Sequence, residues 1–352
     1  MKFQKRYPEA QVGDYFECEY SSVAKVTSVK ECQNCGSMTK WVDVPFQIGV
    51  CSEECHGKLW KRHKRDMVKD SAEDDKAYET WREACKTELK IAEAAESVPV
   101  DILVVVKDQL EYFKKCVESV QEYTDWYHLY IWDNDSGQET KDYIDEILLA
   151  DGGESISVIT SEDNIGFNIP NNRLAEKGLG EYIILLNSDC QVFQGWSEAM
   201  TGFLDEHPDV AEVGYRGALL GPDGRGFGGA YGYEIDYIPG WCFCIKRECY
   251  EEHGLFDEKN LKFAYCEDAD LSLRLKEFGH KLYAIHVPLV HHYQNKTIAA
   301  IQEEGNIDVQ ATFDHNHEYM SKRWASYLAK DRVLLKQGKE ADEEVQSENP
   351  SG

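Results

Sequence analysis

The sequence has no apolar run long enough to cross a lipid bilayer, although 42% of its 352 residues are hydrophobic. A membrane-spanning helix needs about 20 consecutive apolar residues. The first six residues are also not followed by the apolar stretch of a secretory signal. We therefore expect a cytoplasmic protein without an integral membrane segment.

Basic side chains are few compared with acidic ones: 38 Lys and Arg stand against 65 Asp and Glu, and the formal net charge is −27. This charge keeps a protein soluble and opposes non-specific binding to nucleic acid or anionic membranes. Part of the acidity falls in residues 339–352, which we expect to form a disordered acidic tail. The charge argues weakly against a polyanionic partner and is still compatible with a local basic patch.

The twelve cysteines are irregularly spaced apart from one group, and the missing export signal favours thiols or metal ligands over disulfides. That group consists of two pairs of cysteines, Cys32 with Cys35 and Cys51 with Cys55. Two residues lie between the members of the first pair, three between those of the second, and fifteen between the two pairs. Such pairs suit four thiolates around a structural Zn²⁺, because each pair fits on one tight turn. We expect a zinc-binding module over residues 1–65 that resembles a treble-clef or ribbon-type zinc finger, with His56 or His63 as less favoured ligands.

Composition divides the remaining chain into further regions. Residues 66–97 are charged and rich in Ala, with sparse apolar anchors such as Trp81 and Ile91, which favours one or two surface helices acting as a helical linker. Residues 98–297 alternate apolar strands with helical stretches, the pattern of an α/β sheet with crossover helices. We expect a C-terminal helical extension over residues 298–338.

Four apolar segments of the α/β region are predicted strands, and each ends in polar residues. They span residues 101–106, 128–132, 156–160 and 182–186. In open α/β sheets ligands bind at the carboxyl ends of the strands. The fourth segment leads directly to Asp189, so it delivers a carboxylate to a place where a metal-bound phosphate could lie.

Short motifs in the same region occur in the order found in a known family. They are Trp132-Asp133-Asn134-Asp135-Ser136, Asn164-Ile165-Gly166-Phe167, Leu186-Asn187-Ser188-Asp189, Glu267-Asp268-Ala269-Asp270 and His291. With these motifs the chain resembles, over roughly two hundred residues, the family 2 glycosyltransferases, especially the rhamnosyltransferase-like branch. These are inverting enzymes of the GT-A fold. The resemblance implies a GT-A-like (Rossmann-like) mixed α/β sheet flanked by helices, for a nucleotide-diphospho-sugar transferase.

The resemblance assigns a metal site. Asp189 matches the last aspartate of the family's DxD motif, Asn187 stands at its first acidic position, and His291 matches a histidine that ligates the metal or touches the diphosphate. A bound Mn²⁺ or Mg²⁺ would neutralise charge on the leaving diphosphate as a Lewis acid. His292 is the alternative ligand, because neighbours on an extended segment face opposite ways. A turn aspartate and a buried structural histidine are the simpler explanations of Asp189 and His291.

The resemblance also assigns contacts to the donor. Asp133 would accept hydrogen bonds from the base or ribose, and Asp108 lies in the loop that meets the base, where many relatives have asparagine. The asparagine and glycine positions would lie over the diphosphate or the sugar. These donor-binding candidates are Asp108, Asp133, Asn164, Gly166, Asn172 and Asn187. An ordinary Asn/Gly loop explains Asn172 equally well.

An inverting transfer needs a general base for the attacking hydroxyl. Within the acidic motif the resemblance places this role on Asp268. Acidic residues also favour the first turn of a helix, and an apolar helical pattern follows Asp268, so both roles are compatible.

We therefore expect a metal-dependent inverting glycosyltransferase that moves a hexose from a UDP- or dTDP-sugar to a hydroxyl acceptor. The acceptor is a polysaccharide or other glycan, or a modified DNA base, which the basic run of residues 58–65 could help to bind. That run could equally be a solvated helix face. The alternative is a non-catalytic zinc-finger adaptor whose sugar-nucleotide domain is degenerate, and a nucleotidyltransferase is a weaker alternative.

Overall fold

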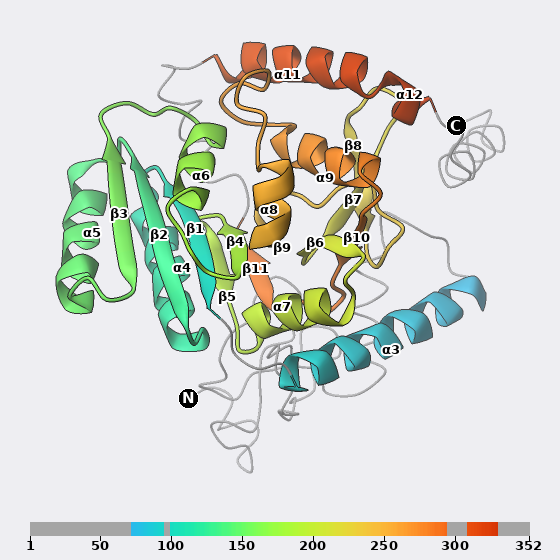
Figure 1. Ribbon diagram of the computed structural model, residues 1–352, viewed down its shortest axis with the longest axis horizontal. Coiled ribbons are helices and arrows are strands. Elements are labelled where there is room, and N and C mark those ends of the chain that lie inside the picture. Colours follow the sequence, from blue (N-terminus) through green and yellow to red (C-terminus); the bar gives the residue numbers. More distant parts are fainter. Residues whose placement is uncertain (1–71, 95–98, 294–307, 330–352) are drawn as a thin grey trace, which may run out of the picture.

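The computed structural model describes residues 72–94, 99–293 and 308–329 (Figure 1). The expected zinc ligands lie outside these described residues; they are Cys32, Cys35, Cys51 and Cys55. The expected acidic tail, residues 339–352, lies outside them as well. No helix in the described ranges is both long enough and apolar enough to pass through a membrane.

A seven-stranded mixed sheet forms the centre of the molecule, in the order β10-β6-β9-β4-β1-β2-β3. Its strands are β1 Val100–Val106, β2 Tyr127–Asn134, β3 Ile156–Ser161, β4 Tyr182–Leu186, β6 Val210–Gly214, β9 Cys242–Lys246 and β10 Lys281–Ala284. Strands β3, β2, β1 and β4 are parallel neighbours, while β9 runs antiparallel to β4 and β6. The four predicted strands are present, with ends that differ by no more than two residues.

Helices cover both faces of this sheet (Figure 1). One face is covered by α3 Ala72–Ala94, α4 Leu110–Tyr123, α5 Gln138–Asp151 and α7 Trp196–Glu206, and the other by α6 Asn168–Ala175, α8 Arg247–His253 and α9 Glu267–Glu277. In β1, Ile102 and Val104 belong to the first apolar layer and Leu103 to the second. A strand buried on both faces is apolar throughout, which is why the sequence of β1 does not alternate.

Two small antiparallel sheets flank the large one. Strand β5 Cys190–Val192 pairs with β11 Val290–His292, and β7 Gly217–Leu220 pairs with β8 Gly226–Ala230. Since β5 follows β4 almost directly, the β5–β11 pair lies next to the carboxyl end of β4. This pairing brings residues about one hundred positions apart in the sequence to one edge of the sheet.

Helix α3 is an integrated part of the α/β domain. It packs against α7 and contributes Cys85, Ile91 and Ala92 to the apolar layer. Its buried Glu88 accepts hydrogen bonds from the backbone N–H groups of His286 and Val287 and from the Tyr283 hydroxyl. Glu88 thereby fixes the segment that leads into β11. The polar sequence of this helix indicated a surface position, and it gave no sign of this buried carboxylate.

The C-terminal region supplies α11 Val309–Arg323 and α12 Ala325–Leu328. Helix α11 crosses the molecule above α9 (Figure 1). Its Met320, together with Trp324 and Leu328, forms a third apolar cluster with Leu273 of α9. Within the expected extension, the described residues 308–329 contain these two helices, which pack onto the acidic helix α9.

Candidate active site

The carboxyl ends of β1, β2 and β4 define one edge of the sheet, because these strands are parallel neighbours. The loops that follow β1 and β4 carry Asp108 and Asp189, and Asp133 lies at the end of β2, just before the third loop. The same edge is where ligands bind in open α/β sheets. The three loops therefore form one candidate site.

Asp133 lies near the end of β2 and is almost fully buried. Its Oδ1 accepts a hydrogen bond from the backbone N–H of Ser136 at 2.9 Å. Its Oδ2 has no hydrogen-bond partner among the described residues. A buried carboxylate oxygen without a donor is costly, so this atom is suited to accept a hydrogen bond from a ligand.

Asp108 lies in the loop after β1 and joins this loop to the one after β2. Its Oδ1 accepts from the backbone N–H of Gly137 at 2.6 Å, and its Oδ2 lies 3.0 Å from the Lys107 ammonium group. Lys107 also donates to the Asp135 carbonyl at 2.6 Å. Asp108 thus shapes the two loops around Asp133.

Asn164 and Gly166 form the loop after β3, where sequence reasoning placed donor contacts. The Asn134 amide donates to Asn164 Oδ1 at 2.7 Å and to the Gly166 carbonyl at 2.8 Å. Gly166 has a φ of 88°, and a Cβ there would lie 2.5 Å from the Phe263 carbonyl oxygen. The loop is therefore pressed against the backbone of the segment before α9. Asn134 was not among the predicted site residues, although its position inside a quoted motif was a signal.

The Asn172 side-chain amide forms its hydrogen bonds with the segment after α8. Its Nδ2 donates to the Phe256 carbonyl and to Glu258, both at 2.9 Å, and its Oδ1 accepts from the Phe256 backbone N–H at 3.0 Å. Both polar atoms of the Asn172 side chain therefore fasten the segment after α8. The structure does not bring this residue into contact with Asp189.

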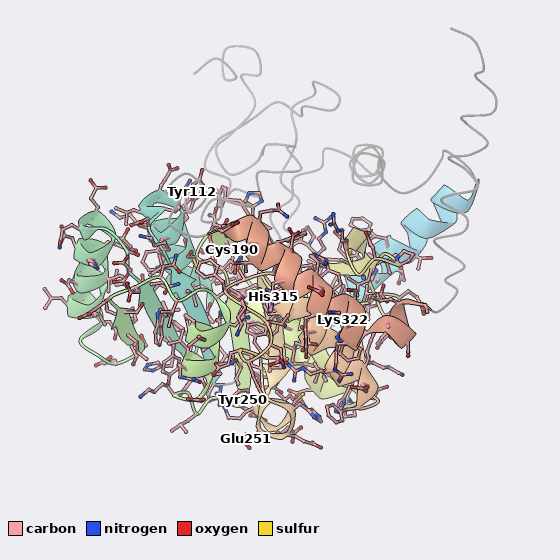
Figure 2. All side chains as sticks on the ribbon, turned by 90° about the horizontal axis from the view of Figure 1, so that it is seen from above. Tyr112, Cys190, Tyr250, Glu251, His315 and Lys322 are labelled. Carbon is pink, nitrogen blue, oxygen red and sulfur yellow. The ribbon has the colours of Figure 1, made fainter. Side chains whose placement is uncertain are left out.

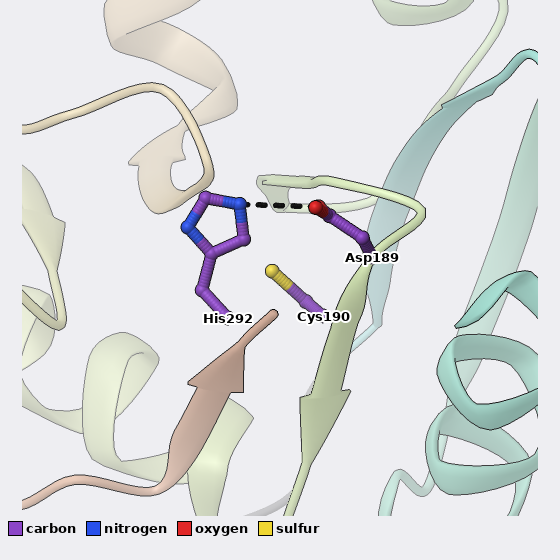
Figure 3. Close-up of side chains that lie close together, drawn as sticks. All are labelled: Asp189, Cys190 and His292. Carbon is purple, nitrogen blue, oxygen red and sulfur yellow. Dashed lines mark ion pairs between the residues drawn. The ribbon is translucent and has the colours of Figure 1, made fainter. Parts of the chain in front are cut away.

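Asp189, Cys190 and His292 form the one group of three close metal-ligating side chains in the described residues (Figure 3). The His292 Nε2 lies 3.1 Å from Asp189 Oδ1, and Asp189 is buried. Asn187 adds a buried Oδ1 that has no partner among the described residues. Carboxylate and amide oxygens fit Mn²⁺ or Mg²⁺, and the imidazole nitrogen favours Mn²⁺ of the two. The Cys190 thiol donates to the Trp241 carbonyl at 3.4 Å, and burial raises its pKa well above its usual value.

His292 rather than His291 points at Asp189. In the antiparallel pair, His292 lies opposite Cys190 and His291 opposite Gln191, so the two rings face different sides. The His291 ring meets the Tyr293 ring at 4.5 Å, and burial lowers the pKa of His291. The sequence favoured His291 and kept His292 as the alternative; the strand pairing brings His292 to the carboxylate.

Asp268 lies in the first turn of α9, partly buried. Its Oδ2 accepts from the Gly240 backbone N–H at 2.9 Å and its Oδ1 from the Ala269 N–H at 2.7 Å. Burial raises the pKa of Asp268, which makes its carboxylate a stronger base than an exposed aspartate. The neighbouring Glu267 is buried with an unpartnered Oε2, and burial followed by the charge of Asp268 raises its pKa well above normal.

Gly240 links Asp268 to the metal-ligating group. The next residue, Trp241, stacks its indole on the His292 ring with centroids 5.2 Å apart. The Trp241 carbonyl accepts from the Asn187 backbone N–H at 2.9 Å. The segment before β9 therefore contacts the candidate base, the candidate metal ligands and the end of β4. Gly240 belongs to a segment that resembles the family, but the sequence gave it no role, because its contact with Asp268 comes from a backbone N–H.

Part of the chain resembles known proteins in sequence and in fold. Residues 101–226 match the family model described as Glycosyl transferase family 2, whereas no curated protein matches the sequence. The solved structure of GalNAc-T7 with UDP, GalNAc and Mn²⁺ is similar, with a TM-score of 0.51 and 19% identity, over 57% of this chain and 44% of that chain.

Two other solved structures are more weakly similar. The mannosyltransferase PcManGT from Pyrobaculum calidifontis, in complex with GDP-Man and Mn²⁺, has a TM-score of 0.42 and 14% identity over 58% of this chain and 61% of that one. The structure of S. aureus TarS 1-349 has the same TM-score and the same sequence identity, over 53% of this chain and 58% of that one. The chain thus spans about half the length of the solved chains that it matches. Residues 101–226 thus match the Glycosyl transferase family 2 model, and they lie within a mixed sheet of GT-A-like fold.

Proposed function

We propose that this protein is a metal-dependent inverting glycosyltransferase. The observation that carries the proposal is the contact between Asp189 and His292 at the carboxyl end of β4, within hydrogen-bond distance at 3.1 Å. It lies on the same sheet edge as the unpartnered Oδ2 of Asp133. The family match over residues 101–226 includes Asp133 and Asp189 and supports the same activity.

In this proposal the donor lies between these groups. Asp133 Oδ2 would accept a hydrogen bond from the base or the ribose, which satisfies its buried oxygen. Asp189, His292 and the Asn187 amide oxygen would hold Mn²⁺ or Mg²⁺. When bound, that ion would neutralise the negative charge of the departing diphosphate. Asn164 and Gly166 shape the loop beside Asp133, and we keep them as donor-binding residues.

Asp268 would be the general base. Its two oxygens receive backbone hydrogen bonds that fix the carboxylate, and its raised pKa makes it a stronger base than an exposed aspartate. The acceptor hydroxyl oxygen forms a bond to the anomeric carbon, and the bond from that carbon to the diphosphate oxygen breaks. The hydroxyl proton passes to Asp268, and the nucleoside diphosphate leaves with the bonding electron pair. Attack opposite the leaving group inverts the configuration.

We propose a UDP- or dTDP-hexose as the donor and a glycan hydroxyl as the acceptor. UDP is the nucleotide named with the similar GalNAc-T7 structure. The net charge of −27 favours a glycan over modified DNA as the acceptor. Assignment to the rhamnosyltransferase-like branch and a structural Zn²⁺ in residues 1–65 belong to the same proposal and rest on the sequence.

A thermal-shift screen of nucleoside diphosphates tests the proposal. We expect UDP or dTDP to raise the melting temperature only when Mn²⁺ or Mg²⁺ is present. Asp189→Ala should remove this metal-dependent shift, while the exposed Asp142→Ala should keep it. Activity is then measured as metal-dependent release of the diphosphate from the matching sugar nucleotide. A protein that binds no nucleoside diphosphate with either metal would contradict the proposal.

A further inference from the structure

Asn316 on α11 is a fully buried polar side chain far along the chain from the sheet edge. Its Nδ2 donates to the carbonyl oxygens of Lys262, Ala264 and Tyr265 at 2.8, 2.9 and 3.0 Å. Its Oδ1 accepts from the Lys262 backbone N–H at 2.8 Å. One amide therefore makes four hydrogen bonds to the backbone of a single loop, and it uses no side chain of that loop.

The loop that Asn316 holds has an unfavourable backbone. Phe263, Tyr265 and Cys266 have φ values of 55°, 76° and 72°. Residues with a Cβ rarely adopt positive φ, and such conformations persist only where the surroundings impose them. None of the three is Gly, Asn or Asp, the residues that tolerate it best. The four bonds from Asn316 provide such a constraint.

The same loop leads into the candidate base. Cys266 is the residue before α9, and Asp268 lies in the first turn of this helix. On its other side the loop meets the donor-side segment, where the Phe263 carbonyl accepts from the Phe167 N–H at 2.6 Å. A shift of residues 263–266 would therefore move the start of α9 relative to Gly240.

Helix α11 is itself held against α9. The Trp324 indole N–H donates to Asp270 Oδ1 at 2.9 Å, and Met320 is buried in the cluster shared with α9. The opposite side of α11 is exposed, as His315 and Lys322 show in the view from above (Figure 2). The inner side of α11 thus provides a fixed support for Asn316.

We propose that Asn316 is a positioning residue for the transfer reaction, and that it holds the 263–266 loop so that Asp268 keeps its place beside Gly240. The inference rests on the proposed function, since it needs Asp268 as the base. Asn316 lies outside the segment that matches the family model, which ends at residue 226. Through this one side chain the C-terminal helix would then support the position of the base, without contacting the substrate.

Two substitutions in the full-length protein test this role. Asn316→Ala removes all four bonds, and Asn316→Asp keeps the size of the side chain while it removes the three donated bonds. For both we expect kcat to fall by about 10- to 100-fold, because displacing a reacting group by about 1 Å has an effect of this order. The KM for the sugar nucleotide and the affinity for the nucleoside diphosphate with Mn²⁺ should stay within about twofold of wild type, because the donor contacts lie on other loops.

Tyr319→Phe is the matched control. It removes one hydrogen bond from the same helix, from the Tyr319 hydroxyl to Asp257, and leaves the 263–266 loop untouched. We expect its kcat to stay within about twofold of wild type. An unchanged kcat in both Asn316 variants would overturn the proposal. Loss of the folded state in both variants would also overturn it, because Asn316 would then have a role in stability alone.

Hydrogen exchange gives a readout that needs no activity. In the wild-type protein the Lys262 amide should be protected, and Asn316→Ala should speed the exchange of amides 262–268 while β1 amides keep their protection. Exchange of residues 262–268 at the wild-type rate in that variant would overturn the positioning role. The wild-type protein could transfer no sugar while Asn316→Ala still speeds the exchange of amides 262–268. The proposed function would then be wrong, but the role of Asn316 in holding the 263–266 loop would be supported.

Discussion

The Nε2 atom of His292 lies 3.1 Å from Oδ1 of Asp189, although the two residues are about one hundred positions apart in the sequence. The pairing of β5 with β11 brings them together. The Trp241 indole then stacks on the imidazole at an interplanar angle of 16°, which fixes the ring from a second side. The two side chains are thus held in fixed positions beside each other, as the proposed cation site requires.

His292→Ala should weaken Mn²⁺ binding. The substitution removes the imidazole nitrogen beside Asp189, and we expect an affinity loss at least as large as the roughly 10- to 100-fold seen when outer partners of metal ligands are removed. Mn²⁺ binding measured by titration calorimetry in the presence of UDP checks this expectation.

His291→Ala is the matched control for that measurement, because His291 lies on the same strand and faces away from Asp189. Its Mn²⁺ affinity should remain within about threefold of wild type. A larger loss in His291→Ala than in His292→Ala would show that the ligand is the other histidine.

Asp268→Asn should abolish transfer and leave donor binding intact. The amide keeps the shape of the carboxylate and an oxygen that can accept from Gly240, but it cannot take a proton. Loss of a general base typically lowers the rate by about 10²- to 10⁴-fold. Steady-state kinetics and UDP binding measured side by side check the prediction, and retained turnover would exclude Asp268 as the base.

The sequence predicted the sheet well because its strands carry a strong local signal. The β1 and β4 segments are apolar at nearly every position, since both faces of each strand are buried. The polar residues that end β2 and β4 also placed Asp133 and Asp189 at the correct edge. These inferences need only local patterns and the rule that parallel strands end together.

The contacts that depend on distant pairing could not be predicted. The choice between His291 and His292 depends on the register of β11 against β5, which neither short strand encodes alone. Asn172 was expected at the donor, but its amide binds the Phe256 backbone. The Asn316 bonds go to backbone atoms of another segment, so no residue type in residues 262–265 indicates them.

Gly166→Ala should destabilise the fold and slow transfer. Gly166 has a φ of 88°, and a Cβ would lie 2.5 Å from the Phe263 carbonyl oxygen and 2.6 Å from its Cα. Backbone atoms cannot move aside as a flexible side chain can, so the loops must separate. We expect a loss of about 2–4 kcal/mol in the free energy of unfolding, from the strained φ and the displaced loop together.

Denaturant unfolding and the transfer rate check this prediction. Gly152→Ala is the control, since Gly152 also has a positive φ of 67° but a Cβ there would meet nothing within 4 Å. It should cost about 1–2 kcal/mol from strain alone and leave the transfer rate unchanged. Equal effects of both substitutions on the rate would mean that the close approach of Gly166 to Phe263 has no functional role.

Glu212 should make the protein less stable as the pH rises through neutrality. This β6 residue is fully buried, and Ser272 donates to its Oε2 at 2.6 Å. Burial raises the pKa of Glu212 to about 8 from 4.5. Between these values the unfolded chain has lost a proton that the folded protein keeps, so the free energy of unfolding falls as the pH increases. The stabilisation from Glu212 is fully present below the pKa that this side chain has in the unfolded protein. As the pH rises to about 8, the free energy of unfolding falls by on the order of 1.4 kcal/mol per pH unit, a few kcal/mol in total.

Glu212→Gln should remove this dependence. The glutamine keeps an oxygen to accept from Ser272 and has no proton to lose. Wild type and variant should therefore unfold at similar urea concentrations near pH 5, and the variant should be the more stable near pH 8. Glu206→Gln, at the exposed end of α7, is the control and should follow the wild-type curve at every pH. Parallel curves for wild type and Glu212→Gln would show that Glu212 is already ionised in the folded protein, with a partner that offsets its burial.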